Sequence, residues 1–198
     1  MKYSLAPLCA LPVFLLAGCG SPPNSAQYVD PNGPHTIVSL NQIDIQDFSN
    51  AGNAMVQDLI NSGVLEKAPQ QPAVLAISRI TNNTTQQFDT DMLTKNIRIA
   101  LLQTGKVVTT TTFGTNPEDK MAQDAGNMQA FMNGQPQPTR IPYYTLSGKI
   151  DINTAKAGDV YQRSYIFQLS LTEVNSGLAV WEGQKIITKQ GQKPAIGW

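Results

Sequence analysis

The chain has 198 residues, of which 41% are hydrophobic, and its 14 basic and 14 acidic side chains leave no formal net charge at pH 7. This size suits one domain with a tether, and without a basic or acidic block the chain is a poor partner for nucleic acid or other polyanions. Cys9 and Cys19 are its two cysteines. Both lie near the start, so the rest of the chain has no disulfide and must be held by apolar burial.

The first 19 residues are typical of a bacterial lipoprotein signal. Lys2 supplies a positive n-region, an apolar segment runs from Leu5 to Leu16, and Leu16-Ala17-Gly18-Cys19 forms a lipobox. The apolar segment is too short to cross a membrane as a helix. We therefore predict that residues 1–18 are cleaved as a signal peptide and that Cys19 is lipidated, which ties the mature chain to a membrane.

A flexible tether is predicted for residues 19–35. The stretch from Gly20 to Pro34 holds four Pro, two Gly and two Ser and few apolar residues, so it buries too little surface to offset its ordering entropy. About 16 residues reach at most ~50 Å, which keeps the domain close to its membrane. The following segment, His35 to Ile45, alternates weakly and is expected to form an ordered arm or a short edge strand.

The first half of the domain shows a helix followed by a strand. Apolar residues at helical spacing predict a helix over 47–60, capped by Asp47 or Ser49 and closed by Gly63. Residues 66–72 are expected to form a loop. The apolar run Ala73 to Ile80 predicts a strand that is covered on both faces.

A second helix, strand and third helix follow. Asp89 is expected to cap a helix that ends at Thr104 before Gly105, and the β-branched residues 106–113 predict a strand. Residues 116–119 look like the start of the third helix. Three of its residues recur at helical spacing and are interpreted as core rather than as a soft binding surface: Met121, Met128 and Phe131.

The last part of the chain predicts three strands. They cover residues 143–152, 161–174 and 178–188, with a tight turn at 175–177 between the last two. The whole pattern predicts an α/β fold: a mixed sheet of four or five strands flanked by about three helices, with a C-terminal antiparallel meander. We expect a single globular domain over residues 36–190 and a frayed tail over 191–198.

Motifs for catalysis are scarce. His35 is the single histidine, beside the tether, and the sequence holds no phosphate loop, nucleophile elbow or zinc-binding helix motif. Asp89 and Asp91 are explained by capping, which leaves a hydrolase based on carboxylates alone as the enzymatic alternative. We predict no catalytic, cofactor-binding or metal-binding residues.

Three segments, 47–65, 73–111 and 146–189, together resemble LpoB-type penicillin-binding-protein activator lipoproteins. The most specific pieces are Ser78-Arg79-Ile80-Thr81-Asn82, Asp89-Thr90-Asp91, Thr94-Lys95, Thr104-Gly105-Lys106 and Gly177 to Gly183. The resemblance implies a fold like the N-terminal domain of TolB. It also implies a non-catalytic outer-membrane lipoprotein, facing the periplasm, that binds a bifunctional class A penicillin-binding protein and stimulates its glycan polymerisation and crosslinking. Gly20, next to the lipidated cysteine, agrees with sorting to the outer membrane.

The chain departs from the family pattern between about residues 126 and 142, where it carries a Gln/Pro-rich loop. In the family this neighbourhood lies near the face that contacts the partner. The exposed polar positions there are the candidate partner contacts: Gln129, Asn133, Gln135 and Arg140. The domain is expected to be monomeric. The alternative function is a structural or assembly lipoprotein of a secretion system or surface appendage, since one fold can host several roles.

Overall fold

Five strands form one mixed sheet in the order β2-β1-β3-β4-β5. Their bounds are β1 Ala73–Asn82, β2 Val107–Thr109, β3 Tyr144–Ala157, β4 Val160–Glu173 and β5 Ala179–Gln192. β1 pairs in parallel with β2 and β3, whereas β4 pairs antiparallel with both β3 and β5. The predicted α/β class and C-terminal antiparallel meander are confirmed.

The computed structural model describes residues 28–31, 33–135 and 141–192. The predicted signal peptide, Cys19 and most of the predicted tether lie outside these residues. Within them, no helix is long and apolar enough to span a membrane.

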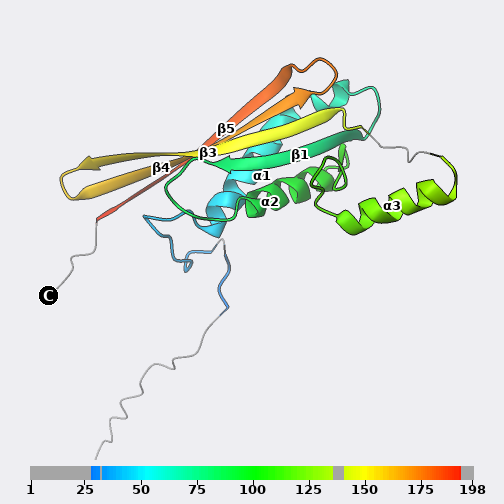
Figure 1. Cartoon of the computed structure of the whole chain (residues 1–198). Coiled ribbons are helices and arrows are strands. Elements are labelled where there is room, and N and C mark those ends of the chain that lie inside the picture. Colours follow the sequence, from blue (N-terminus) through cyan, green and yellow to red (C-terminus); the bar gives the residue numbers. More distant parts are fainter. Residues whose placement is uncertain (1–27, 32, 136–140, 193–198) are drawn as a thin grey trace, which may run out of the picture.

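The helices are α1 Ile45–Asn61, a 3₁₀ turn η1 Leu65–Lys67, α2 Asp91–Gln103 and α3 Lys120–Met132. Figure 1 shows α1 and α2 against one face of the sheet, whereas α3 lies to the side. The predicted order of helices and strands is confirmed, and η1 is a short addition within the expected loop.

The core lies between the sheet and the pair α1 and α2. Leu59 of α1, Leu93, Ile97 and Leu101 of α2, and Phe167 of β4 are at most 1% exposed. These positions follow the helical spacing of the sequence, because a 3.6-residue repeat turns one stripe of each helix toward the sheet. Large side chains that are fully buried include Tyr144, Tyr165, Phe167, Met55, Leu59, Leu65, Leu75, Ile80, Leu93, Ile97, Leu101 and Leu146.

Three local predictions are wrong. β1 is covered on one face instead of two, since both packed helices lie on the same side and Val74 and Ala76 are only half-buried. β2 has three residues, because it is an edge strand that pairs only with the first part of β1. The cap of α1 is Asp44, whose N–H donates to the Asp47 carboxylate at 2.8 Å.

Two predicted helix ends are confirmed. Gly63 and Gly105 follow α1 and α2 with φ of +68° each, a conformation that a side chain with a Cβ disfavours. The hairpin turn between β4 and β5 is also confirmed, with the Gly177 N–H donating to the Glu173 carbonyl at 2.9 Å. β5 continues to Gln192, two residues beyond the predicted end of the domain.

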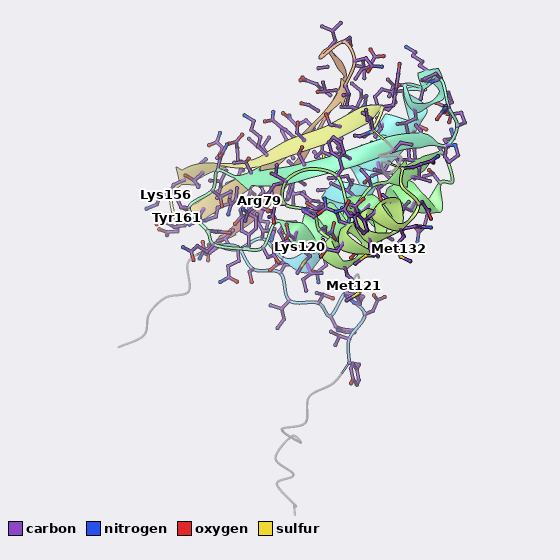
Figure 2. The ribbon with its side chains drawn as sticks, turned by 45° about the vertical axis from the view of Figure 1, so that its right-hand side comes forward. Arg79, Lys120, Met121, Met132, Lys156 and Tyr161 are labelled. Atoms are coloured by element: carbon purple, nitrogen blue, oxygen red, sulfur yellow. The ribbon has the colours of Figure 1, made fainter. Side chains whose placement is uncertain are left out.

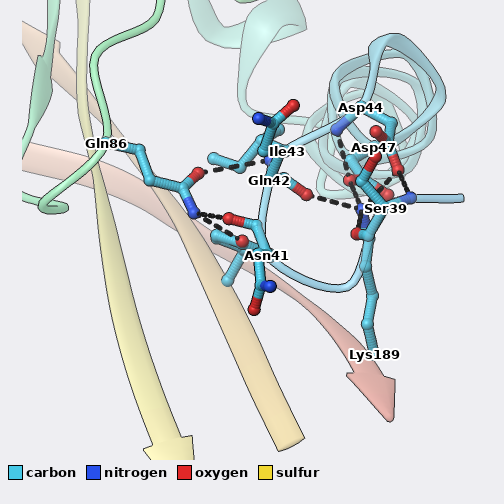
Figure 3. Close-up of polar contacts among 9 residues, drawn as sticks. Ser39, Asn41, Gln42, Ile43, Asp44, Asp47, Gln86 and Lys189 are labelled. Carbon is cyan, nitrogen blue, oxygen red and sulfur yellow. Dashed lines mark hydrogen bonds and ion pairs between the residues drawn. The ribbon is translucent and has the colours of Figure 1, made fainter. Parts of the chain in front are cut away.

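The arm before α1 is fixed by one buried lysine. The Lys189 ammonium, at the end of β5, donates to the carbonyls of Ser39 and Gln42 at 3.2 and 2.9 Å. It also pairs with Asp44 at 2.7 Å and Asp47 at 2.5 Å, and all three side chains are at most 14% exposed (Figure 3). We call this cluster the arm clip. Of the two alternatives predicted for this segment, an ordered arm or a short edge strand, residues 35–44 form the ordered arm.

A glutamine holds the same arm from its other side. Gln86 donates to the Asn41 carbonyl and accepts the Ile43 N–H at 3.3 Å (Figure 3). Its amide also donates to the Tyr165 hydroxyl at 3.0 Å. The arm is thereby tied to the sheet through β4 as well as β5.

Candidate functional site

A β-bulge in β1 aims polar residues at the start of α2. The pairing of β1 with β3 shifts between Ile77 and Ile80, so that Ser78 and Arg79 are exposed while Ile80 returns to the core at 2% exposure. A bulge re-aims side chains in this way because it inserts one unpaired residue. No partner for the Arg79 guanidinium is found among the described residues.

A hollow of about 400 Å³ lies between this bulge, the first turns of α2 and the loop before α3. We call it the bulge hollow. Its lining residues are Ile77, Ser78, Arg79, Asp91, Thr94, Lys95, Arg98, Asn116, Pro117 and Glu118. Half of these residues belong to the short pieces on which the family resemblance rests, although those pieces are separated along the sequence. The fold therefore brings parts of three of the five pieces to one place.

Glu118 closes one side of the bulge hollow. Its carboxylate pairs with Lys95 and with Arg98, the latter at 2.5 Å. The hydrogen bond from Lys95 lowers the pKa of Glu118, with a further contribution from Arg98. Arg98 is 8% exposed, and its Nε finds no hydrogen-bond partner within the described part of the chain. We call the Glu118 pairing the latch, since it fixes the loop that leads into α3.

Few other contacts hold α3 on the domain. Gly126 is the one buried residue of its 13. The Asp119 N–H donates to the Thr111 carbonyl at 3.0 Å, and the Gln123 amide donates to the Thr112 carbonyl at 3.2 Å. The Asp119 carboxylate caps the helix by accepting the Ala122 N–H at 2.9 Å.

The interpretation of the α3 methionines as core is wrong. Met121, Met128 and Phe131 are 82%, 61% and 84% exposed. The opposite side of α3 carries small residues instead: Gly126, which is buried, and Ala130, which is partly buried. Helical spacing in the sequence shows that a stripe exists but not which way it faces.

The predicted partner contacts lie around the end of this helix. Gln129, Asn133 and Gln135 are all exposed, in the last turn of α3 and just after it. Arg140 lies outside the described residues. The structure brings the first three to one end of α3.

The two aspartates weighed as catalytic carboxylates act as helix-start residues. The Asp89 carboxylate accepts the Asp91 N–H at 2.8 Å, and α2 begins at Asp91. His35 is exposed on the arm. Across residues 28–31, 33–135 and 141–192, no group of three or more His, Cys, Asp or Glu could hold a metal ion.

The sheet face opposite the helices is polar. Hydrogen bonds between neighbouring strands join Gln168 to Gln184 at 2.8 Å and Ser170 to Glu182 at 3.2 Å. A shallow hollow of about 670 Å³ crosses this face, and Ser147 and Lys149 line it from β3. This face explains the alternation of polar residues in β3 to β5, because an antiparallel sheet can expose one face to water.

Fold and site together define the class: a small α/β domain with a mixed five-stranded sheet, a family-specific hollow at a β-bulge and an exposed helix beside it. The chain belongs to the LpoB family, because its residues 47–187 match the model of the family described as peptidoglycan-synthase activator LpoB. This is a family of activators and not of catalysts, and membership supports activation of peptidoglycan synthesis as the general function.

Comparison with solved structures finds several similar chains. The LpoB C-terminal domain from Escherichia coli is 17% identical, with 71% of this chain and 98% of that chain covered and a TM-score of 0.45. The NMR structure of E. coli LpoB is 17% identical, with coverage of 96% and 93% and a TM-score of 0.41. Lipoprotein GNA1162 from Neisseria meningitidis is 12% identical, with coverage of 63% and 88% and a TM-score of 0.38. No curated protein sequence matches the chain.

Proposed function

We propose that this protein is an outer-membrane lipoprotein that binds a bifunctional class A penicillin-binding protein and stimulates its glycan polymerisation and crosslinking. The observation that carries the proposal is the family match over residues 47–187, which spans the domain from α1 to β5. The bulge hollow supports it, because a surface gathered from separate family-specific pieces is expected to serve the family's task.

The membrane attachment in this proposal rests on the lipobox. Cleavage before Cys19 would leave that residue as the lipidated N-terminus, and Gly20 after it favours the outer membrane. The segment before Ser39 is the leash between lipid and domain, since the arm clip fixes the chain from Ser39 onward. The domain acts as a monomer at the periplasmic face of the membrane.

The partner contacts are proposed on the side of the domain that carries the bulge hollow and α3. Gln129, Asn133 and Gln135 are exposed at the end of α3, and Arg140 follows five residues after Gln135 in the sequence. The latch joins this helix to the hollow through Lys95 and Arg98. One partner could therefore contact both features together.

An activity assay tests this function. The full-length protein, purified in detergent, is mixed with the class A synthase of the same organism, and polymerisation of fluorescent lipid-linked precursor is followed with time. Stimulation that saturates with the concentration of the lipoprotein, together with co-purification, is the expected result. No binding at micromolar concentrations and an unchanged rate would overturn the proposal.

The membrane address has its own test. Cell envelopes are separated on a density gradient, and the wild-type chain is expected in the outer-membrane fraction. Cys19→Ala removes the lipidated residue and is expected to move the protein out of that fraction. Recovery of Cys19→Ala with the outer membrane would contradict lipid anchoring at this residue.

A further inference from the structure

α3 presents a continuous apolar stripe to solvent. The 3.6-residue repeat places Met121, Ala125, Met128 and Met132 on one side of the helix. The three methionines are 82%, 61% and 77% exposed, and Phe131 beside them is 84% exposed. We call Met121, Ala125, Met128 and Met132 the methionine stripe. Figure 2 shows Met121 and Met132 at the outer side of the molecule, along α3.

The direction of the stripe is set by contacts on the opposite side of α3. Gly126 is buried there, and Gln123 donates to the Thr112 carbonyl. The latch fixes the chain two residues before the helix. Rotation of α3 to hide the stripe would break these contacts, so the stripe is a stable surface feature. A contiguous apolar patch of this kind on a small domain marks an interaction site.

A second copy of the chain fits this surface poorly. An aromatic side chain buries about 150–250 Å², and the stripe has three methionines and an alanine with one phenylalanine beside them. Their combined surface stays below the ~800 Å² per partner of a standard stable interface. A two-fold dimer through α3 would therefore be weak.

A lipid surface also fits poorly. α3 and its cap carry Asp119 and Asp124 against the single cation Lys120. Helices that lie on membranes are rich in Lys and Arg on their polar side, because the lipid surface is negative. α3 lacks such an excess of cations, since Asp124 follows Lys120 by one helical turn and the Asp119 carboxylate caps the helix, so its charges would not attract an anionic lipid surface.

We propose that the methionine stripe inserts into an apolar groove of the synthase. The inference rests on the proposed function and adds the contact surface and its chemistry. An amphipathic helix in a groove is a recurrent mode of recognition with anchors at the spacing seen here. Methionine suits it, since its unbranched side chain adapts to the shape of the groove. In this proposal the methionine stripe anchors the synthase, and the polar residues Gln129 and Asn133 lie beside the stripe.

The test compares variants of the full-length protein in detergent. Met128→Glu combined with Met132→Glu is expected to weaken binding to the synthase at least tenfold, and Met128→Leu with Met132→Leu to keep it within threefold. Met92→Glu, at a 40%-exposed methionine on α2, is the matched control and is expected to change affinity less than twofold. Circular dichroism of each variant checks that the helices are retained.

The possible outcomes distinguish failure of this inference from failure of the proposed activator function. If the wild-type chain binds the synthase and the double Glu variant binds equally well, the stripe is not the anchor but the activator function stands. If the wild-type chain does not bind any class A synthase of its organism, both fail.

A photocrosslinking experiment identifies the molecule that contacts the methionine stripe. p-Benzoylphenylalanine at position 131 is irradiated in liposomes that contain the lipoprotein and the purified synthase. Crosslinks to the synthase that map to an apolar groove support the proposal. Crosslinks to lipid or to a second copy of the chain would overturn it.

Discussion

The Lys189 ammonium lies 2.7 Å from the carboxylate of Asp44, although 145 residues separate them in sequence. Lys189 is in β5, the last strand, and Asp44 caps α1, the first helix. The pair therefore joins the two ends of the domain. Asp47 and two carbonyls of the arm complete the set of acceptors around the one ammonium.

Lys189→Met is expected to destabilise the domain strongly. The change leaves Asp44 and Asp47 with little water and without their cation, and breaking a buried pair in this way costs about 3–5 kcal/mol. Urea unfolding followed by circular dichroism measures the loss. Lys185→Met, at an exposed lysine of the same strand, should stay within ~0.5 kcal/mol. Equal stability of the two variants would contradict the importance of the arm clip.

The arm clip also predicts an alkaline transition. Burial lowers the pKa of Lys189, but hydrogen bonds to Asp44 and Asp47 outweigh burial and raise it above its ordinary 10.5. The stabilisation is present in full below pH 10.5 and is lost as the pH rises through the higher folded pKa. Unfolding free energies measured from pH 9 to 12 should fall for the wild-type chain, and Lys189→Met should lack this part of the fall.

Glu118→Gln is expected to loosen α3 without unfolding the domain. It weakens the latch with Lys95 and Arg98, and a part-exposed ion pair contributes at most about 1 kcal/mol. Hydrogen–deuterium exchange of residues 120–132 should rise severalfold while exchange in β3 and β4 is unchanged. Glu66→Gln, which removes an exposed pair with Lys106, is the control and should leave α3 unaffected.

Acid should reproduce the effect of Glu118→Gln. The hydrogen bond from Lys95 lowers the pKa of Glu118 below its ordinary 4.5. Its stabilisation is therefore present above pH 4.5 and is lost as the pH falls through the lower folded pKa. Exchange in α3, corrected for the intrinsic pH dependence, should rise in the wild-type chain in that range. If exchange in α3 rises by the same factor in the Glu118→Gln variant, the acid effect does not come from the latch.

Gly148→Ala tests how closely β3 and β4 pack. A Cβ at this position would lie 2.6 Å from the Gln168 carbonyl oxygen and 2.6 Å from Leu169 Cδ2. Overpacking of this kind costs about 1–3 kcal/mol. Thermal and urea unfolding should show the loss, whereas Ser147→Ala on the open face should change little. A Gly148→Ala variant as stable as the wild-type chain would mean that the two strands can move apart freely.

Arg79→Ala is expected to affect partner binding more than stability. Its guanidinium is exposed at the bulge, so unfolding should change by less than ~0.5 kcal/mol. If the bulge hollow contacts the synthase, loss of an arginine there should cost more than ~1 kcal/mol, about fivefold in affinity. Arg163→Ala on β4 is the control, and surface plasmon resonance compares the two. Equal affinities would remove the bulge hollow from the interface.

Local chemistry explains what could be predicted from the sequence. The core stripes of α1 and α2, the glycines that end both helices and the turn before Gly177 each depend on residues close together in the chain. The edge position of β2 does not, because pairing partners decide where a strand stops. The shift between Ile77 and Ile80 likewise arises only when β1 meets β3.

The candidate site was harder to predict for the same reason. Ser78, Asp91 and Lys95 were marked by the family resemblance, but the sequence does not show that they line one hollow with Glu118. The direction of the α3 stripe depends on contacts far apart in sequence, such as the hydrogen bond from Gln123 to the Thr112 carbonyl and the latch. Small residues at 126 and 130, opposite the methionines, were the signal that could have indicated a close approach on that side.

The arm clip decides where mechanical force enters the domain. A pull on the chain before Ser39 would reach Lys189 on β5 and Gln86 next to β1 before it could peel α1 from the core. β5 is paired with β4 from Val160 to Thr172, so a load that enters at Lys189, near the open end of this hairpin, would be spread along the strand pair. Tension on the chain before Ser39 would therefore be borne by the sheet, while α1 stays on the core.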